Sequence, residues 1–144
     1  MSSWKNEYRS FYYENAPEPD DIVINKGSSA LLVIDIQNTY LEPDDDPNEA
    51  ARWVPFYTRM NNIVIPKTVE MVQWARVNEI EVIFARIACL KEDGRDRSLS
   101  QKKPGFNYLL MPKNSEESQI VKELSPQRDE ICVIKTTDSA LTGT

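Results

Sequence analysis

The chain has 144 residues, of which 40% are hydrophobic and 28% are charged, and its formal net charge is −6. This length and composition are typical of one globular domain with a sizeable core. The acidic balance argues against nucleic acid or an anionic membrane as a partner, because both attract a basic surface. No apolar run approaches the ~18 residues that a membrane-spanning helix needs.

The residue types present limit the chemistry that this chain can perform. It has no histidine, which is the commonest general base and the commonest zinc ligand. We therefore expect no metal site and no cofactor, and catalysis would fall to carboxylates, lysine, cysteine or tyrosine. The two cysteines, Cys89 and Cys132, lie in strand-like segments without the spacing of a disulfide framework, which favours free thiols and a cytoplasmic location.

The first part of the chain is expected to be an N-terminal arm and connector, residues 1–27, ahead of a single domain over 28–144. Four aromatic residues in the arm have the spacing of one helical face: Trp4, Tyr8, Phe11 and Tyr12. Two interpretations fit this pattern. A short helix packs on its own domain, or the arm reaches a neighbouring subunit of a homo-oligomer, which is the assembly that we expect.

Three apolar segments predict the strands of a parallel sheet. The first is Ala30–Asp35, an unbroken run suited to a strand that is covered on both faces, and the others are Glu81–Ile87 and Glu130–Lys135. Helical spacing predicts a long helix within Tyr57–Asn78, and a cap residue with acidic neighbours predicts a short helix over Asn114–Leu124. This alternation indicates an α/β fold.

Two polar segments are predicted to be loops. The acidic stretch Glu42–Glu49 has consecutive aspartates without the alternation of a calcium loop, which favours a solvated loop. The segment Lys91–Lys113 is longer than a connection requires and carries basic residues interleaved with acidic ones. The basic residues are Lys91, Arg95, Arg97, Lys102 and Lys103. This segment is either a solvated loop or a lid that offers Arg or Lys to a polar or anionic substrate, with Phe106 and Tyr108 as an apolar wall.

Candidate catalytic residues lie where the predicted strands end. Ligands of open parallel sheets bind beyond the carboxyl ends of the strands, and Asp35, Cys89 and Lys135 occupy these places. The lysine can hold a nucleophile deprotonated, and the aspartate can take and return a proton. Alternatives are a structural ion pair or two solvated strand ends. Cys89 is either a reactive thiol or a neutral core residue, and Cys132, on the opposite face of its strand from Lys135, is expected in the core.

Three segments form an ordered set of motifs: residues 30–42 (ALLVIDIQNTYLE), 81–87 (EVIFARI) and 135–144 (KTTDSALTGT). Together they resemble the isochorismatase-like cysteine hydrolases, whose first strand ends in Asp-x-Gln-Asn/Asp and whose lysine precedes Ser-Ala-Phe and Gly-Thr. Leu141 replaces the usual Phe, and Thr137-Asp138 replaces a pair that is often Arg/Tyr. These departures concern substrate contacts and leave the lysine in place.

The resemblance implies a fold and a mechanism. The fold is a three-layer α/β/α domain with a mainly parallel, Rossmann-like sheet, whose C-terminal strands are absent from the 144 residues. Asp35 would be the general base and Lys135 the second member of a triad, while Gln37, Asn38 and Tyr40 would form the substrate site. The third member, a cysteine nucleophile, is expected beyond residue 144, so these residues alone are expected to be inactive.

The implied reaction is hydrolysis of a C–N bond in a small amide, ureido or carbamoyl compound. A second possibility is the vinyl-ether hydrolysis of isochorismatases proper, which uses no cysteine. A third is a non-catalytic, shortened relative that acts by binding or assembly. The metal-dependent nicotinamidase branch is disfavoured, because its metal site needs histidines that this chain lacks.

Overall fold

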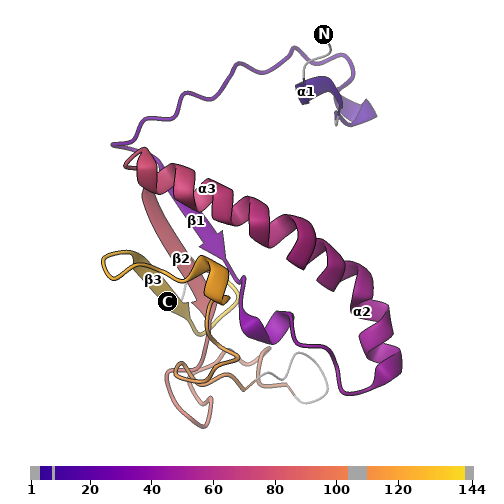
Figure 1. Cartoon of the computed structure of the whole chain (residues 1–144), viewed down its shortest axis with the longest axis vertical. Coiled ribbons are helices and arrows are strands. Elements are labelled where there is room, and N and C mark those ends of the chain that lie inside the picture. The colour runs from indigo at the N-terminus through magenta and orange to yellow at the C-terminus, as the bar shows by residue number, and fades with distance from the viewer. Residues whose placement is uncertain (1–3, 8, 104–109, 142–144) are drawn as a thin grey trace.

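A parallel three-stranded sheet forms the centre of the structure, a computed structural model that describes residues 4–7, 9–103 and 110–141 (Figure 1). The strands are β1 (Ala30–Ile34), β2 (Glu81–Ile87) and β3 (Ile131–Lys135), in the order β1-β2-β3. Both pairings are parallel. The predicted α/β class and the three predicted strands are confirmed, with ends that differ by no more than one residue.

The long helix begins earlier than the sequence predicts. Helix α2 (Pro47–Arg59) starts inside the acidic stretch that was expected to be a loop. The Asp46 side chain accepts a hydrogen bond from the Asn48 N–H at 2.8 Å, and Pro47 occupies the first turn, where a missing N–H costs nothing. Part of this acidic stretch therefore caps a helix.

The same helix continues through a π-helical segment, η3 (Met60–Val64), into α3 (Ile65–Val77). In η3 the Ile65 N–H bonds to the Met60 carbonyl, five residues back. Pro66 gives a physical reason, because it has no N–H to donate and its ring crowds the preceding turn. The helix predicted within Tyr57–Asn78 is thus the second half of a longer one (Figure 1).

The core lies between α3 and one face of the sheet. Val72 and Ala75 of α3 are buried in one cluster with Val33 of β1 and with Val82 and Phe84 of β2. A further set from the segment before β3 completes the cluster: Ile120, Val121 and Leu124. On the other face of the sheet, three large side chains are exposed in the described chain: Leu32, Ile34 and Ile131.

The helix predicted over Asn114–Leu124 is wrong. Only a 3-10 turn, η4 (Lys122–Leu124), is helical there. The guanidinium of Arg86, in β2, donates hydrogen bonds to the carbonyls of Lys113 and Ser118, both at 2.9 Å. The side-chain amide of Gln119 donates to the Ser115 carbonyl at 2.7 Å. These side chains occupy the acceptors that a helix would need for its own N–H groups.

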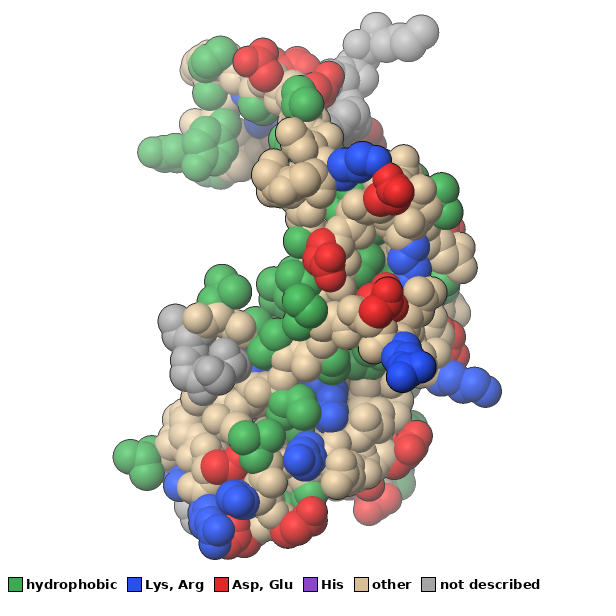
Figure 2. All heavy atoms as spheres, turned by 90° about the vertical axis from the view of Figure 1, so that its left-hand side faces the viewer, with side chains coloured by type: hydrophobic (Ala, Val, Ile, Leu, Met, Phe, Trp, Pro, Cys, Tyr) green, Lys and Arg blue, Asp and Glu red, His purple; other side chains and the backbone are tan. Residues whose placement is uncertain are grey.

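The N-terminal arm contains two short turns in place of the single predicted helix: α1 (Trp4–Glu7) and a 3-10 turn, η1 (Phe11–Tyr13). Tyr8 and the Trp4 side chain lie outside the described parts of the structure. Figure 2 shows a wide hollow between the arm and the body of the molecule. No described helix combines the length and the apolar character needed to cross a membrane.

Candidate active site

The carboxyl ends of β1 and β3 lie on either side of β2. Ile34 is paired with Ala85, and Lys135 is paired with Ile87, so Asp35 and Lys135 flank the last residues of β2. Neighbouring strands are ~4.8 Å apart, so about twice that distance separates the two backbones. Only a long side chain bridges such a gap, and lysine provides one.

The Asp35 backbone turns sharply to present its side chain. Its N–H donates to the Ala85 carbonyl at 2.9 Å, which continues the sheet by one bond. Its φ is 57°, in the left-handed region that few non-glycine residues adopt, although Asp and Asn tolerate it best. Unusual backbone of this kind is concentrated at functional sites.

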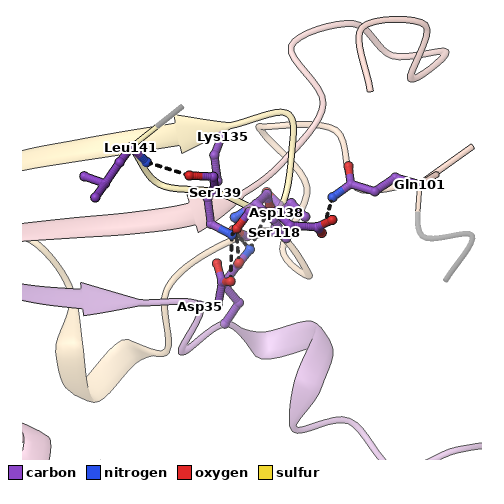
Figure 3. A network of polar contacts seen from close by, with 9 residues as sticks. Asp35, Gln101, Ser118, Lys135, Asp138, Ser139 and Leu141 are labelled. Carbon is purple, nitrogen blue, oxygen red and sulfur yellow. Dashed lines mark hydrogen bonds and ion pairs between the residues drawn. The ribbon is translucent and has the colours of Figure 1, made fainter. Parts of the chain in front are cut away.

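An ion pair joins the two predicted catalytic residues. Lys135 Nζ lies 2.7 Å from Asp35 Oδ2 and donates a second hydrogen bond to the Asp138 carbonyl at 3.0 Å (Figure 3). The Lys135 side chain is 1% exposed and that of Asp35 is 34% exposed. The strand ends therefore meet as the sequence predicted, while the catalytic roles of the two residues stay a prediction.

The second oxygen of Asp35 has spare capacity. Oδ1 is buried and has no hydrogen-bond partner among the described residues. Leaving a buried carboxylate oxygen unpaired costs free energy, and native structures seldom do so without a reason. A proton acceptor held beside an ammonium group fits general base catalysis with a neighbouring anionic nucleophile.

Gln37 supports the site from behind. Its side chain is fully buried, donates to the carbonyls of Ile87 and Ser118 at 2.9 and 2.8 Å, and accepts from the Ile87 N–H at 2.8 Å. Both amide hydrogens are thus used inside the chain. Gln37 links the end of β1 to the end of β2, and this leaves no amide N–H for a substrate.

The other two predicted substrate residues, Asn38 and Tyr40, have different surroundings. Asn38 donates to the Glu116 carbonyl at 2.9 Å and thereby holds the segment before β3. Tyr40 is partly buried; burial, together with the negative charge of Asp35, raises the pKa of its hydroxyl. Since the charge of Asp35 acts on this hydroxyl, Tyr40 is the predicted substrate residue that the structure associates with the ion pair.

A cavity of 330 Å³ lies beside Tyr40. Its other walls include Trp53, Phe56 and Tyr57 of α2, aromatic residues that sequence reasoning did not associate with the site. A larger apolar cavity of 540 Å³, between α3 and the start of β1, lies at the amino end of the sheet, away from the ion pair. Neither Asp35 nor Lys135 is a lining residue of these two cavities.

The cysteines occupy different environments. Cys89 is 1% exposed, and its backbone bonds to Met111 across the long loop, so its thiol is closed to a substrate here. Cys132 is exposed, which contradicts its predicted place in the core. It lies on β3, at the edge of the sheet, where α3 does not cover it. Among the described residues, no cluster of three or more Asp, Glu or Cys side chains could hold a metal ion.

The long loop Lys91–Lys113 contributes buried polar residues next to the ion pair. Gln101 is fully buried and donates to Asp138 Oδ1 at 2.6 Å, and Arg97 is 6% exposed (Figure 3 shows Gln101 and Asp138). Sequence reasoning missed Gln101, and it considered Asp138 only as a departure from the family motif, without its contacts to Gln101 and Lys135. Phe106 and Tyr108, the predicted apolar wall, lie outside the described residues.

Comparison with known proteins identifies relatives over most of the chain. The family model of the Isochorismatase domain matches residues 29–144. An isochorismatase family protein from Desulfovibrio vulgaris subsp. vulgaris str. Hildenborough is 25% identical, with a TM-score of 0.57 over 81% of this chain and 56% of that one. No curated protein matches the chain significantly.

Two further solved structures share the fold. A cysteine hydrolase from Pseudomonas syringae pv. phaseolicola 1448A has a TM-score of 0.61 and 22% identity over 83% of this chain and 51% of that one. The N-carbamoylsarcosine amidase from Thermoplasma acidophilum has a TM-score of 0.53 and 16% identity, over 81% and 56% respectively. This chain therefore spans about half the length of the solved structures that it matches.

Proposed function

The chain belongs to the isochorismatase family of hydrolases, and we propose that its protein cleaves a C–N bond in a small amide, ureido or carbamoyl compound. Asp35 and Lys135 would act with a cysteine nucleophile that lies outside residues 1–144. The observation that carries this proposal is the ion pair between the buried Lys135 and the partly exposed Asp35, which leaves one aspartate oxygen free to exchange a proton.

The proposed reaction has two steps. Asp35 takes the thiol proton, the Lys135 ammonium stabilises the thiolate, and the thiolate attacks the carbonyl carbon. Asp35 then returns the proton to the leaving nitrogen as the C–N bond breaks, which gives an acyl-enzyme and an amine or ammonia. In the second step Asp35 removes a proton from water, and the resulting hydroxide attacks the acyl carbon. The C–S bond then breaks, the carboxylic or carbamic acid leaves, and Asp35 returns the proton to the departing thiolate.

The alternatives have weaker support. Asp35 accepts a hydrogen bond from Lys135, an arrangement that suits a base more than the proton donor that vinyl-ether cleavage requires. One fold neighbour is named as an amidase of a carbamoyl compound, although at 16% identity this likeness concerns the fold alone. A non-catalytic relative gives no reason for an unpaired, buried aspartate oxygen.

An ammonia-release screen of small amides and ureido compounds tests the proposal, with the longest native form of the protein and isochorismate alongside. Intact mass establishes whether that form extends past Thr144. Ammonia release that disappears in Asp35→Asn supports the proposal. Pyruvate from isochorismate without ammonia from any amide would favour the vinyl-ether reaction, and no turnover of either class would favour the non-catalytic alternative.

A further inference from the structure

Arg97 is a buried cation that pairs with no anion in the described parts of the chain. Its Nε donates a long hydrogen bond of 3.4 Å to Gln101 Oε1. Its Nη2 is buried and has no partner among the described residues, and no described carboxylate lies within ion-pair distance of it. Burying a charge is costly unless an opposite charge accompanies it, so the site lacks an acceptor that an anion would supply.

Hydrogen bonds connect Arg97 to the catalytic pair. Gln101 accepts a hydrogen bond from Arg97. Gln101 in turn donates to Asp138 Oδ1, and the Asp138 carbonyl accepts from Lys135, which pairs with Asp35 (Figure 3). The two buried polar atoms without partners in this network, Asp35 Oδ1 and Arg97 Nη2, therefore belong to one cluster. Asp35 Oδ1 can accept a proton, and Arg97 Nη2 can donate a hydrogen bond to an acceptor oxygen.

The Arg97 charge also acts at the front of the site. The positive charge of Arg97 opposes burial and Asp35, which raise the pKa of the Tyr40 hydroxyl. Tyr40 lines the aromatic cavity beside α2, whereas Arg97 lines a separate cavity of 210 Å³ within the loop, together with Gly94 and Lys102. Arg97 thus borders a cavity of its own and acts on Tyr40 through its charge.

The loop is built to hold Arg97 in place. Asp96 accepts hydrogen bonds from the Leu90 and Lys91 N–H groups at 2.7 and 3.3 Å, which closes a compact turn. Gly94 has a φ of 64°, and a Cβ there would lie 2.8 Å from Leu110 Cδ1, so glycine is strongly favoured at this position. The Arg97 N–H bonds back to the Gly94 carbonyl at 3.1 Å.

We propose that Arg97 binds a carboxylate of the substrate, so that the compound hydrolysed is an amide or ureido compound that carries an acid group. This inference rests on the proposed function and narrows its substrate class. A guanidinium group presents N–H donors in the plane that a carboxylate requires. The neighbouring Asp35 and Asp138 carboxylates disfavour a dianion such as phosphate, so a singly charged anion fits best.

Matched substrate pairs test the inference on the full-length protein. N-carbamoylglycine and isobutylurea have nearly the same shape, because two methyl groups replace the carboxylate oxygens. We expect kcat/KM to favour the acid by about 10- to 100-fold, the range of a charge-assisted hydrogen bond. Arg97→Met should abolish this ratio, Arg97→Lys should keep part of it, and Arg95→Met, on the exposed part of the same loop, should leave it unchanged.

The outcomes separate this inference from the proposed function. The inference is wrong if acids and neutral partners across several such pairs react or bind equally well, or if Arg97→Met weakens both equally. Hydrolysis of the neutral partners in that case would leave the proposed function intact. If nothing is hydrolysed, calorimetric binding decides: acid binding that Arg97→Met removes supports the inference, and its absence in the native protein refutes it. Inorganic phosphate serves as the dianion control.

Discussion

Two ion pairs lie at opposite ends of the same sheet, and they differ in whether both oxygens of the carboxylate accept hydrogen bonds. At the amino end, Arg76 of α3 reaches both oxygens of Glu130, the residue before β3, at 2.7 and 2.8 Å. At the carboxyl end, Lys135 reaches one oxygen of Asp35 at 2.7 Å, and the other oxygen is buried without a described partner. Distance alone therefore does not distinguish a structural pair from a catalytic candidate.

Glu130 and Asp35 differ in how many of their carboxylate oxygens are hydrogen-bonded and in their backbone conformation. Glu130 uses both oxygens, one of which also accepts from the Gln127 N–H at 2.7 Å. Asp35 keeps one oxygen in reserve and adopts a left-handed backbone, whereas Glu130 does not. A pair whose groups are all used contributes to stability, while a pair with an unused acceptor on an unusual backbone is suited to chemistry.

The largest expected difference is in activity. Asp35→Asn should lower kcat/KM for an amide substrate by about 10²- to 10⁴-fold, the usual contribution of a general base. Asparagine tolerates the left-handed backbone, but it leaves the buried Lys135 ammonium without its anion, so the melting temperature should fall while the protein stays folded. Glu130→Gln should retain activity and lower the free energy of unfolding by about 1 kcal/mol. Equal losses of activity in the two variants would remove the distinction between the pairs.

The next effect is on stability at the carboxyl end. Lys135→Met should lower the free energy of unfolding by about 1–3 kcal/mol, less than for a fully buried pair because Asp35 is partly exposed to water. Adding Asp35→Asn should recover part of this loss, because the unpaired carboxylate is then gone. Urea unfolding measures both. Lys67→Met, which removes an exposed pair with Glu70, is the matched control and should cost far less.

A smaller effect concerns pH and the amino-end pair. The hydrogen bond from Arg76 lowers the pKa of the Glu130 carboxyl, so below its unfolded-state pKa the folded chain binds fewer protons than the unfolded chain. The contribution of the pair is complete above that unfolded value and is lost as pH falls through the lowered folded value. The free energy of unfolding of the native protein should therefore fall more steeply with acid than that of Glu130→Gln.

Chemical denaturation between pH 6 and pH 3, a range around the ordinary glutamate pKa of ~4.3, measures this slope. Glu70→Gln alters an exposed pair by the same chemistry and should leave the slope close to that of the native protein. A Glu130→Gln slope that matches the native slope would show that this pair contributes nothing to acid sensitivity.

The smallest effect tests whether Tyr40 shares the electrostatics of the catalytic pair. Burial and then the charge of Asp35 raise the pKa of the Tyr40 hydroxyl. In Asp35→Asn this pKa should fall towards its ordinary value without reaching it, because burial remains. Ultraviolet titration, with Tyr40→Phe subtracted to isolate this residue, follows the change. An unchanged Tyr40 titration would place Asp35 too far away to act on it.

The sheet and the ion pair were accessible from sequence because each rests on a local signal. An apolar run that stops at a charged residue marks both a strand and its end, and parallel pairing brings such ends together, as Asp35 and Lys135 show. The start of α2 was missed because acidic residues are typical of both loops and helix caps. Only the structure shows that Asp46 accepts the Asn48 N–H.

Other features depend on contacts between distant residues and leave no local pattern. The predicted helix before β3 does not form because Arg86, far earlier in the chain, donates hydrogen bonds to the carbonyls of Lys113 and Ser118. Gln37 belongs to the matched motif, yet its hydrogen bonds show that it holds strand ends together. Arg97 and Arg95 look alike in sequence, and only burial separates the cation beside the site from the one in water.

The π segment η3 sets the angle between the two halves of the long helix. Each helical residue adds about 100° of rotation, so its wider turn offsets α2 from α3 by roughly that amount. With this offset, Trp53, Phe56 and Tyr57 border the Tyr40 cavity while Val72 and Ala75 face the sheet. Inserting or removing one residue in Met60–Val64 would swing one set against the other, so the shape of the Tyr40 cavity would change while Asp35 and Lys135 stay in place.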